Sequence, residues 1–246
     1  MLGIENLSVS VDGKRLLEDV NLHVLNGETV ALFGPNGSGK TSLLKTIMGV
    51  PSYRVESGRI LFRDSDITSM DMDERARRGI GMSFQRPPAV RGLKLQELLH
   101  LCIEKRGKPD NALIHEYLST LNLLDFPGRD VNMGFSGGEI KRSELVQLLA
   151  QDPDLCLFDE PDSGVDLVSI QLVGNVINRL LQKEKKKSTR NKAGLIISHA
   201  GHILDYVNAD RAYVMLEGTV YCSGNPRELL DDIREKGYEG CAICPG

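Results

Sequence analysis

The sequence lacks any apolar run long enough to cross a membrane. Its longest unbroken apolar stretches, such as 155–158 and 195–197, contain only a few residues, whereas a membrane helix needs roughly 18 or more. The first residues, Met1–Glu5, contain neither the basic segment nor the apolar segment of a secretory signal. We therefore expect a cytoplasmic chain that does not span a bilayer by itself.

The chain also lacks an excess of positive charge and an even set of cysteines. Its formal net charge is −4, which argues against nonspecific binding to nucleic acid, because such binding depends on a basic surface. Five cysteines in a presumed cytosolic chain do not indicate a disulfide framework. Cys102, Cys156 and Cys222 fall on predicted helices or strands, and we expect small buried apolar residues there rather than catalytic thiols.

The composition is that of a folded globular protein. Hydrophobic residues make up 41% and charged residues 26% of the 246 residues, a balance too apolar for a disordered chain. A chain of this length can bury a sizeable core, and we expect one compact unit.

Apolar periodicity predicts an α/β fold. Apolar residues at helical spacing predict helices between 93 and 125. The lysine-rich run 183–187 is expected to be a solvated loop. We predict one domain in which 1–91 and 153–246 form a β-rich catalytic lobe and 92–152 form a helical subdomain. The predicted strands are 4–11, 22–24, 29–33, 58–62, 79–84, 155–158 and 194–198, and the main helices are 41–48, 73–78, 138–150 and 167–182.

A glycine-rich loop lies between a predicted strand and a predicted helix. Residues 34–41 fit the pattern GxxxxGK[ST], whose glycines let backbone N–H groups face phosphate oxygens at the positive end of the helix. Lys40 is expected to reach the β and γ phosphates, and Thr41, rather than Ser42, to ligate Mg²⁺. The expected nucleotide-binding residues are Gly34, Pro35, Asn36, Gly37, Ser38, Gly39, Lys40, Thr41 and Ser42.

Two carboxylates follow the buried strand 155–158, at the strand end where α/β folds place their ligands. Asp159 is expected to hold Mg²⁺ and Glu160 to take a proton from the attacking water as general base. Gln85 and His199 also follow predicted strands. Gln85 is a candidate for orienting water and contacting the metal, and His199 for touching the γ-phosphate. Polar residues are common at strand ends, so a structural role for both stays open.

A second predicted helix begins in a way that suits an anion. Ser136 lies at its cap, and Gly137 and Gly138 expose backbone N–H groups ahead of Glu139. With this segment, the chain resembles the ABC ATPase family over nearly its whole length. The motifs occur in that family's order: Walker A at 34–41, Gln85, the signature at 136–139, Walker B at 155–159, the D-loop at 163–166 and His199.

This resemblance implies a P-loop ABC cassette, with a RecA-like lobe and a helical subdomain, that hydrolyses ATP with Mg²⁺. In the family, ATP lies between Walker A of one subunit and the signature of another. The resemblance therefore implies a homodimer on ATP binding and poor hydrolysis by a lone subunit. The residues expected to serve the partner's nucleotide are Ser136, Gly137, Gly138, Glu139 and Asp166.

Within the family, four segments resemble SufC, the iron–sulfur assembly ATPase of the SUF system: 84–87, 132–142, 162–166 and 235–238. SufC-like proteins bind a β-helical SufB/SufD-like scaffold pair and remodel it by ATP-driven dimerisation. The resemblance implies docking through 93–125 and the surroundings of Gln85. Glu139 stands where the ABC family more commonly has glutamine, and Pro161 follows Glu160 as it does in many transporter cassettes. A second interpretation therefore stays open: a nucleotide-binding subunit of an ABC membrane transporter, held at the membrane by a permease.

Two departures from the family remain. The family stacks adenine on an aromatic residue in the first sheet, but the matching stretch 11–15 has none, which leaves the preference for ATP over GTP open. The tail carries a CxxC pair, Cys241 and Cys244, which could supply half of a zinc or iron–sulfur site or be a reduced terminus. A third interpretation is therefore a metal or cluster carrier.

Overall fold

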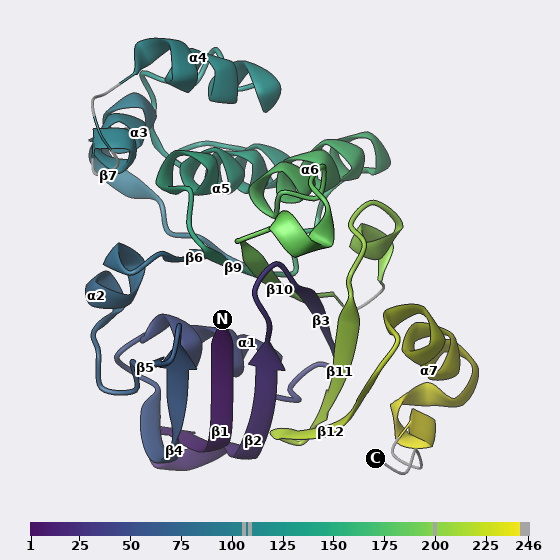
Figure 1. Ribbon diagram of the computed structural model, residues 1–246. Helices are drawn as coiled ribbons and strands as arrows, with labels where there is room; N and C mark the ends of the chain where they lie inside the picture. Colours follow the sequence, from purple (N-terminus) through teal and green to yellow (C-terminus); the bar gives the residue numbers. More distant parts are fainter. Residues whose placement is uncertain (105–106, 108–109, 199–200, 242–246) are drawn as a thin grey trace.

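Two large β-sheets, a small two-stranded ribbon and a group of helices make up the computed structural model, which describes residues 1–104, 107, 110–198 and 201–241 (Figure 1). The first sheet is antiparallel, with strand order β2-β1-β4-β5. Its strands are β1 (Leu2–Val11), β2 (Lys14–Val24), β4 (Arg54–Phe62) and β5 (Ser65–Asp66).

The second sheet has six strands, in the order β12-β11-β3-β10-β9-β6. Its strands β11, β3, β10, β9 and β6 are parallel, and only the edge strand β12 runs antiparallel. The carboxyl ends of the parallel strands therefore meet at one edge of the sheet. The strands are β3 (Thr29–Phe33), β6 (Ile80–Ser83), β9 (Leu155–Asp159), β10 (Ala193–Ile197), β11 (Arg211–Leu216) and β12 (Thr219–Gly224).

Strand β9 is buried on both faces, as its unbroken apolar sequence predicted. Leu155 and Leu157 pack into the core shared with the antiparallel sheet. Cys156 and Phe158 point the other way, into the core formed with the helices. The strand is thus packed between two apolar cores, which fixes the position of the carboxylates at its end, Asp159 and Glu160.

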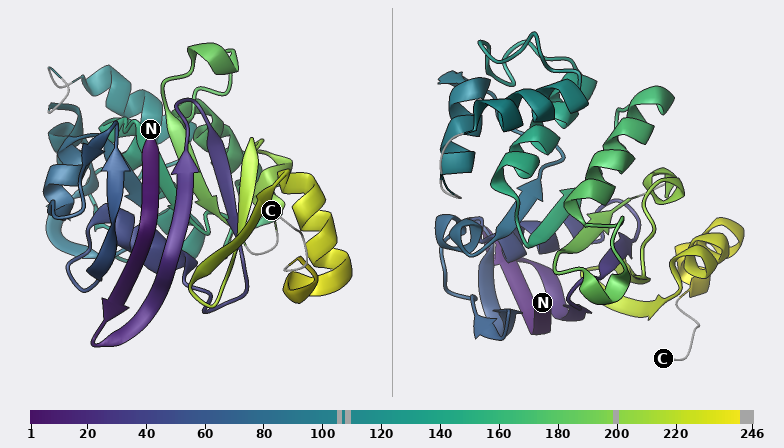
Figure 2. Two further views of the ribbon diagram at one scale, coloured as in Figure 1. Left: turned by 60° about the horizontal axis from the view of Figure 1, so that its bottom comes forward. Right: turned by 45° about the horizontal axis from the view of Figure 1, so that its top comes forward.

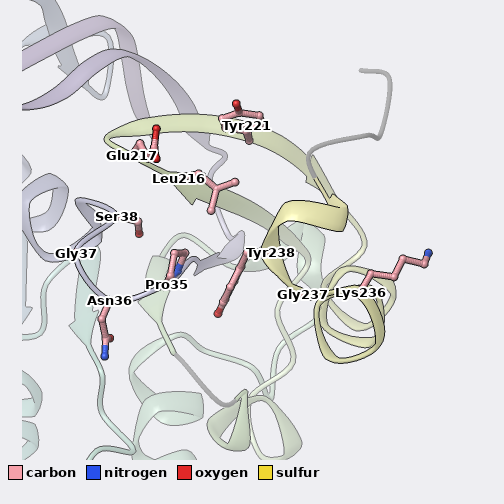
Figure 3. A pocket seen from close by; sticks show the side chains of 10 residues that line it. All are labelled: Pro35, Asn36, Gly37, Ser38, Leu216, Glu217, Tyr221, Lys236, Gly237 and Tyr238. Carbon is pink, nitrogen blue, oxygen red and sulfur yellow. The ribbon is translucent and has the colours of Figure 1, made fainter.

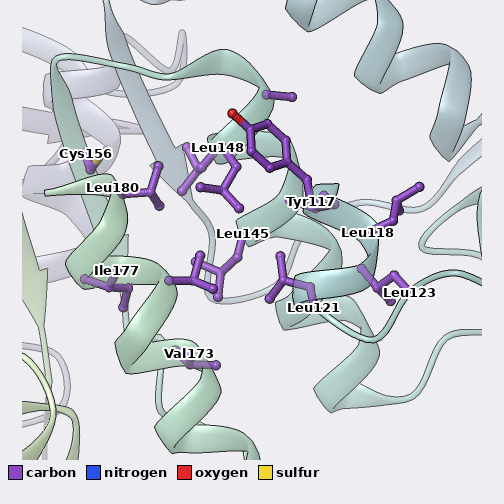
Figure 4. Close-up of a cluster of buried hydrophobic side chains, with 14 of the residues drawn as sticks. Tyr117, Leu118, Leu121, Leu123, Leu145, Leu148, Cys156, Val173, Ile177 and Leu180 are labelled. Atoms are coloured by element: carbon purple, nitrogen blue, oxygen red, sulfur yellow. The ribbon is translucent and has the colours of Figure 1, made fainter. Parts of the chain in front are cut away.

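Four helices pack around one apolar core on one face of the six-stranded sheet: α3 (Leu95–Glu104), α4 (Asn111–Thr120), α5 (Gly137–Gln151) and α6 (Leu167–Leu180). Figure 4 shows Leu121 beyond α4, Leu145 of α5 and Ile177 of α6 directed toward one another. Asp110 starts α4 by accepting hydrogen bonds from the backbone N–H groups of Ala112 and Leu113.

The helices outside the four-helix group are α1 (Lys40–Met48), α2 (Met72–Arg77), α7 (Pro226–Cys241) and two short 3₁₀ helices, Lys187–Thr189 and His202–Asp205. Of these helices, α1 packs into the core shared by the two sheets, and α7 packs beside β11 and β12 (Figure 2). None of the helices in the described part of the chain is long and apolar enough to cross a bilayer.

The α/β fold and the order of the predicted elements are confirmed, but β11, β12 and α7 were not predicted and several details were wrong. The sequence did not predict the small ribbon of β7 (Val90–Lys94) and β8 (Asp130–Val131), because β8 has only two residues. In the run 183–187, residues 184–187 are exposed as expected, whereas the Lys183 side chain is 11% exposed and its Nζ lies 3.4 Å from Asp210 Oδ2. Cys156 is buried as expected, whereas Cys102 and Cys222 are only half-buried. The subdomain limits of 92 and 152 stay a prediction.

Candidate nucleotide site

The loop between β3 and α1 is built on glycines. The φ angle is 151° at Gly34 and 101° at Gly39, a region that favours glycine. A Cβ on Gly34 would lie 2.2 Å from Met215 O, so no other residue fits there. Helix α1 begins directly after Gly39 and has no acidic residue in its first turn. Its first N–H groups therefore face the space in front of the loop, the arrangement that binds phosphate.

The ammonium group of Lys40 is held inside this loop. Lys40 is 4% exposed, and its Nζ donates hydrogen bonds to Gly34 O and Pro35 O, both at 2.8 Å. Burial lowers the pKa of Lys40 to about 8, while the charges of Glu160 and Asp159 oppose this shift. A bound phosphate would favour the protonated form, because an opposite charge stabilises a cation. Lys40 can thus exchange the loop carbonyls for phosphate oxygens.

Thr41 and Asp159 form a pair of oxygen donors beside the loop. Thr41 Oγ1 donates a hydrogen bond to Asp159 Oδ1 at 3.0 Å. Asp159 is fully buried, and within the described part of the chain its Oδ2 has no hydrogen-bond partner. Burial raises the pKa of the Asp159 carboxyl. A buried carboxylate with a free oxygen next to a hydroxyl suits a hard divalent cation, so these residues fit Mg²⁺.

Glu160 meets Gln85 across the strand ends. Gln85 Nε2 donates a hydrogen bond to Glu160 Oε2 at 2.7 Å, which joins the segment after β6 to the end of β9. Glu160 is buried and has a φ of 50°, in the left-handed region. Such a backbone costs about 1–3 kcal/mol in a residue other than glycine and is frequent at functional sites. The structure therefore brings the predicted base and the predicted water-orienting amide into contact.

The signature segment starts α5 with a reciprocal cap. Ser136 Oγ accepts a hydrogen bond from Glu139 N at 3.4 Å, and Glu139 Oε2 accepts one from Ser136 N at 2.7 Å. This second bond is the main reason that the pKa of Glu139 is lowered. Ser136 and Gly137 are exposed, and Gly138 is half-buried. The capped end of α5 thus presents backbone N–H groups to the outside of the molecule.

The D-loop lies next to this exposed segment. A Cβ on Gly137 would come within 4.0 Å of Gly164 O. The Asp166 carboxylate accepts hydrogen bonds from Ser169 N at 2.9 Å and Ser169 Oγ at 2.7 Å, at the start of α6. The structure therefore assigns Asp166 a capping contact within its own chain, alongside the role predicted toward a partner.

Two predicted site residues, His199 and Cys244, lie outside the described residues. Cys241 is the last residue of α7. Within 1–104, 107, 110–198 and 201–241, no group of three or more His, Cys, Asp or Glu side chains is placed to hold a metal ion. Burial raises the pKa of the Cys156 thiol to about 12, which agrees with its predicted inert role.

A hollow of about 690 Å³ opens beside the tip of the glycine loop (Figure 3). Figure 3 shows the Tyr238 ring between α7 and Pro35. Tyr238 belongs to the segment 235–238 singled out above, but its position beside the loop was not predicted, because it lies some two hundred residues away in the sequence. The lining residues are Pro35, Asn36, Gly37, Ser38, Leu216, Glu217, Tyr221, Lys236, Gly237 and Tyr238.

An apolar groove of about 530 Å³ lies between α2, β6 and the ends of α1 and α5. It reaches Phe84, the residue before Gln85. Its lining is rich in methionine, and two acidic residues from the start of α2 lie at its margin. The groove is lined by Met48, Pro51, Asp71, Met72, Asp73, Ala76, Ile80, Gly81, Met82, Phe84 and Gln151.

Comparison with known protein families and curated proteins agrees with this site. A family model described as "ABC transporter" matches residues 17–163. The "Probable ATP-dependent transporter ycf16" of Cyanophora paradoxa is 34% identical over 97% of this chain and 93% of its own length. The "Probable ATP-dependent transporter slr0075" of Synechocystis sp. is 36% identical over 97% and 94%. A "Probable ABC transporter ATP-binding protein" of Streptococcus pyogenes serotype M3 is 35% identical over 98% and 95%.

Solved structures give the same result. A nucleotide-free ATP-binding cassette from an ABC transporter superposes with a TM-score of 0.78 and 25% identity, over 100% of this chain and 99% of that chain. A dimeric ATP-binding cassette bound to ADP and Pi shares the fold, with a TM-score of 0.77 and 23% identity over 92% and 98%. The glycine loop, the acid strand and these matches over the whole chain agree: the protein belongs to the ABC transporter ATPase family, whose cassettes bind ATP with Mg²⁺ and hydrolyse it.

Proposed function

We propose that Glu160 is the general base for ATP hydrolysis and that Gln85 positions the attacking water beside it. The observation that carries this assignment is the 2.7 Å hydrogen bond from Gln85 Nε2 to Glu160 Oε2, next to the Thr41–Asp159 pair. Glu160 would accept the proton of the water, and the Gln85 amide would hold that water in line with the γ-phosphate. His199 is proposed to contact the γ-phosphate.

The phosphate-binding groups of the chain fit the same reaction. Lys40 and the first N–H groups of α1 would hold the β and γ phosphates, and Thr41 and Asp159 would hold Mg²⁺, with Gln85 as a further ligand. Bound Mg²⁺ supplies charge neutralisation at the phosphate oxygens. The residues of this chain supply the orientation of the nucleotide and the removal of the proton.

We further propose that two copies of the chain close on ATP. The exposed, capped start of α5 at Ser136 supports this, because its N–H groups face outward rather than into the chain's own site. A second copy would bring the loop of its own site to this segment. One solved relative of the fold is a dimeric cassette, which agrees with the proposal.

The work done by this dimer is proposed to be iron–sulfur cluster assembly in the cytoplasm, on a soluble scaffold of the SufB/SufD type. The resemblance of 132–142 and 162–166 to SufC supports this role. The methionine-rich groove that ends at Phe84 supports docking of a partner, because methionine adapts to irregular apolar surfaces. A partner seated there would lie one residue from Gln85 and could thereby sense the nucleotide.

The alternative function is that of an ATP-binding subunit of a membrane transporter. The printed names of the relatives favour it, since they describe probable transporters and transporter ATP-binding proteins. The same groove would then receive a segment of a permease. Both functions use the same hydrolytic site and differ only in the partner.

Capture of partners by a nucleotide-trapped variant separates the two functions. Tagged Glu160→Gln protein is incubated with MgATP in cytosol and in detergent-solubilised membranes, and the bound proteins are identified by mass spectrometry. Lys40→Met, which should bind ATP more weakly, is the control. ATP-dependent capture of soluble SUF scaffold proteins supports cluster assembly. Capture of an integral membrane permease contradicts it and leaves only the ATPase chemistry.

A further inference from the structure

Helix α5 carries two buried ionisable side chains, Lys141 and Glu144. Their side chains are 7% and 5% exposed, and Lys141 Nζ lies 3.7 Å from Glu144 Oε2. Two buried charges are costly to desolvate and are weak evidence for stability. Their contacts therefore call for another explanation.

Both side chains bind the backbone just before Gln85. Glu144 Oε1 accepts a hydrogen bond from Phe84 N at 2.7 Å, and Lys141 Nζ donates one to Phe84 O at 2.8 Å. Glu144 Oε2 also accepts one from Ser83 Oγ at 3.1 Å. The N–H and C=O groups of Phe84 are thus both engaged by one helix.

The position of Phe84 explains why these hydrogen bonds matter. Strand β6 is the edge strand of its sheet and ends at Ser83, which pairs with Phe158 of β9. The backbone of Phe84 lies beyond that pairing, and the side chains of α5 take the place of a neighbouring strand. The next residue, Gln85, holds Glu160. One helix therefore fixes the segment that carries the water-orienting amide.

The same helix begins at the signature. Ser136 caps α5, and Lys141 and Glu144 follow within its first turns. We propose that Lys141 and Glu144 form a latch that positions Gln85 against Glu160 and ties this contact to the signature end of α5. The latch rests on the proposed function, in which Ser136 serves the partner's nucleotide. Movement of α5 toward a partner's ATP would then move Gln85 in the chain's own site.

The test removes the latch without leaving a buried charge. The variant Lys141→Met/Glu144→Leu is compared with Glu144→Gln, which keeps an acceptor for Phe84 N–H. A further variant, Arg179→Met, breaks the exposed Arg179–Glu116 ion pair (2.6 Å) and serves as the control. Thermal unfolding, ATP affinity, kcat and KM are measured for each.

The expected result is a loss in kcat of about 10²-fold for Lys141→Met/Glu144→Leu, because small displacements of positioning groups cost rates of this order. ATP affinity should stay unchanged, Glu144→Gln should retain most of the turnover, and Arg179→Met should match the parent. In a Gln85→Ala background, removal of the latch should cause no further loss of kcat. Additive losses, or a kcat that falls only with the folded fraction, would overturn the latch.

A separate measurement needs neither nucleotide nor a partner. Hydrogen exchange of the Phe84 amide should be slow in the parent and accelerated by Glu144→Leu alone, even if Lys141→Met/Glu144→Leu does not fold. Fast exchange in the parent would overturn the latch. Failure of the proposed function appears differently, as a parent protein that neither turns over ATP nor dimerises with it.

Discussion

The two phosphate-facing helix starts of the chain differ in how complete they are. At α1, Lys40 is buried and Asp159 and Glu160 lie nearby, so one chain already assembles the loop, the proposed cation ligands and the proposed base. At α5, Ser136 is exposed, and its cap is closed by Glu139 of the same helix. In the proposed mechanism the first start forms a site within one chain, whereas the second is a surface that would acquire a ligand from another molecule.

The largest expected effect comes from removing the proposed base, Glu160, from the site at α1. Glu160→Gln should lower kcat by about 10²- to 10⁴-fold, because the amide cannot accept a proton. ATP binding should be retained, since Lys40 and Thr41 are untouched, and the protein should elute as a dimer in size-exclusion chromatography with MgATP. A variant that stays monomeric with bound ATP would show that the second helix start does not complete the site.

The next effect comes from the buried ammonium. Lys40→Met should weaken ATP binding by about 1.5–3 kcal/mol, the usual value for a hydrogen bond to a charged group. Titration with a fluorescent ATP analogue measures this change. Lys45→Met is the matched control, because Lys45 lies on the same helix, with its Nζ 5.8 Å from the Tyr53 ring centre, and should bind ATP like the parent. Equal affinities for Lys40→Met and the parent would contradict the site.

The smallest effect concerns stability on the α5 side. Burial raises the pKa of Glu144 to about 7, although Lys141 and the hydrogen bonds from Phe84 and Ser83 oppose the shift. The folded state then holds an extra proton between about pH 4.5 and 7, so the free energy of unfolding falls as pH rises through this range, by at most about 3 kcal/mol. Glu144→Gln should lack this decline. Urea unfolding of the parent and of Glu144→Gln at pH 5 and pH 8 measures this change. An equal change in the free energy of unfolding of the two proteins would contradict a proton held by the buried Glu144 carboxyl.

The features of the fold and the site that could be predicted from sequence are those that depend on short, local sequence patterns. The loop at 34–41 and the apolar run before Asp159 carry their geometry within a few residues, because glycines and strand burial act locally. The contact between Gln85 and Glu160 depends on β6 lying next to β9, which a single sequence does not reveal. Gln85 and Glu160 were each predicted as site residues, but the contact between them was not predicted.

The latch could not be found from sequence. Lys141 and Glu144 are charged residues three positions apart on a helix, a pattern typical of an exposed ion pair. Their burial follows from the packing of α5 against β6, which brings together residues about sixty positions apart. Tyr238 was missed for the same reason, because only the fold brings α7 to the loop.

The central claim is that each ATP is hydrolysed between α1 of one chain and α5 of another. It is tested most directly by mixing two inactive proteins, Lys40→Met and Ser136→Arg, and measuring ATPase activity. A mixed dimer pairs the intact loop of the Ser136→Arg chain with the intact signature of the Lys40→Met chain, so the mixture should be clearly more active than either protein alone. A mixture no more active than its parts, or a fully active Ser136→Arg protein, would contradict the claim.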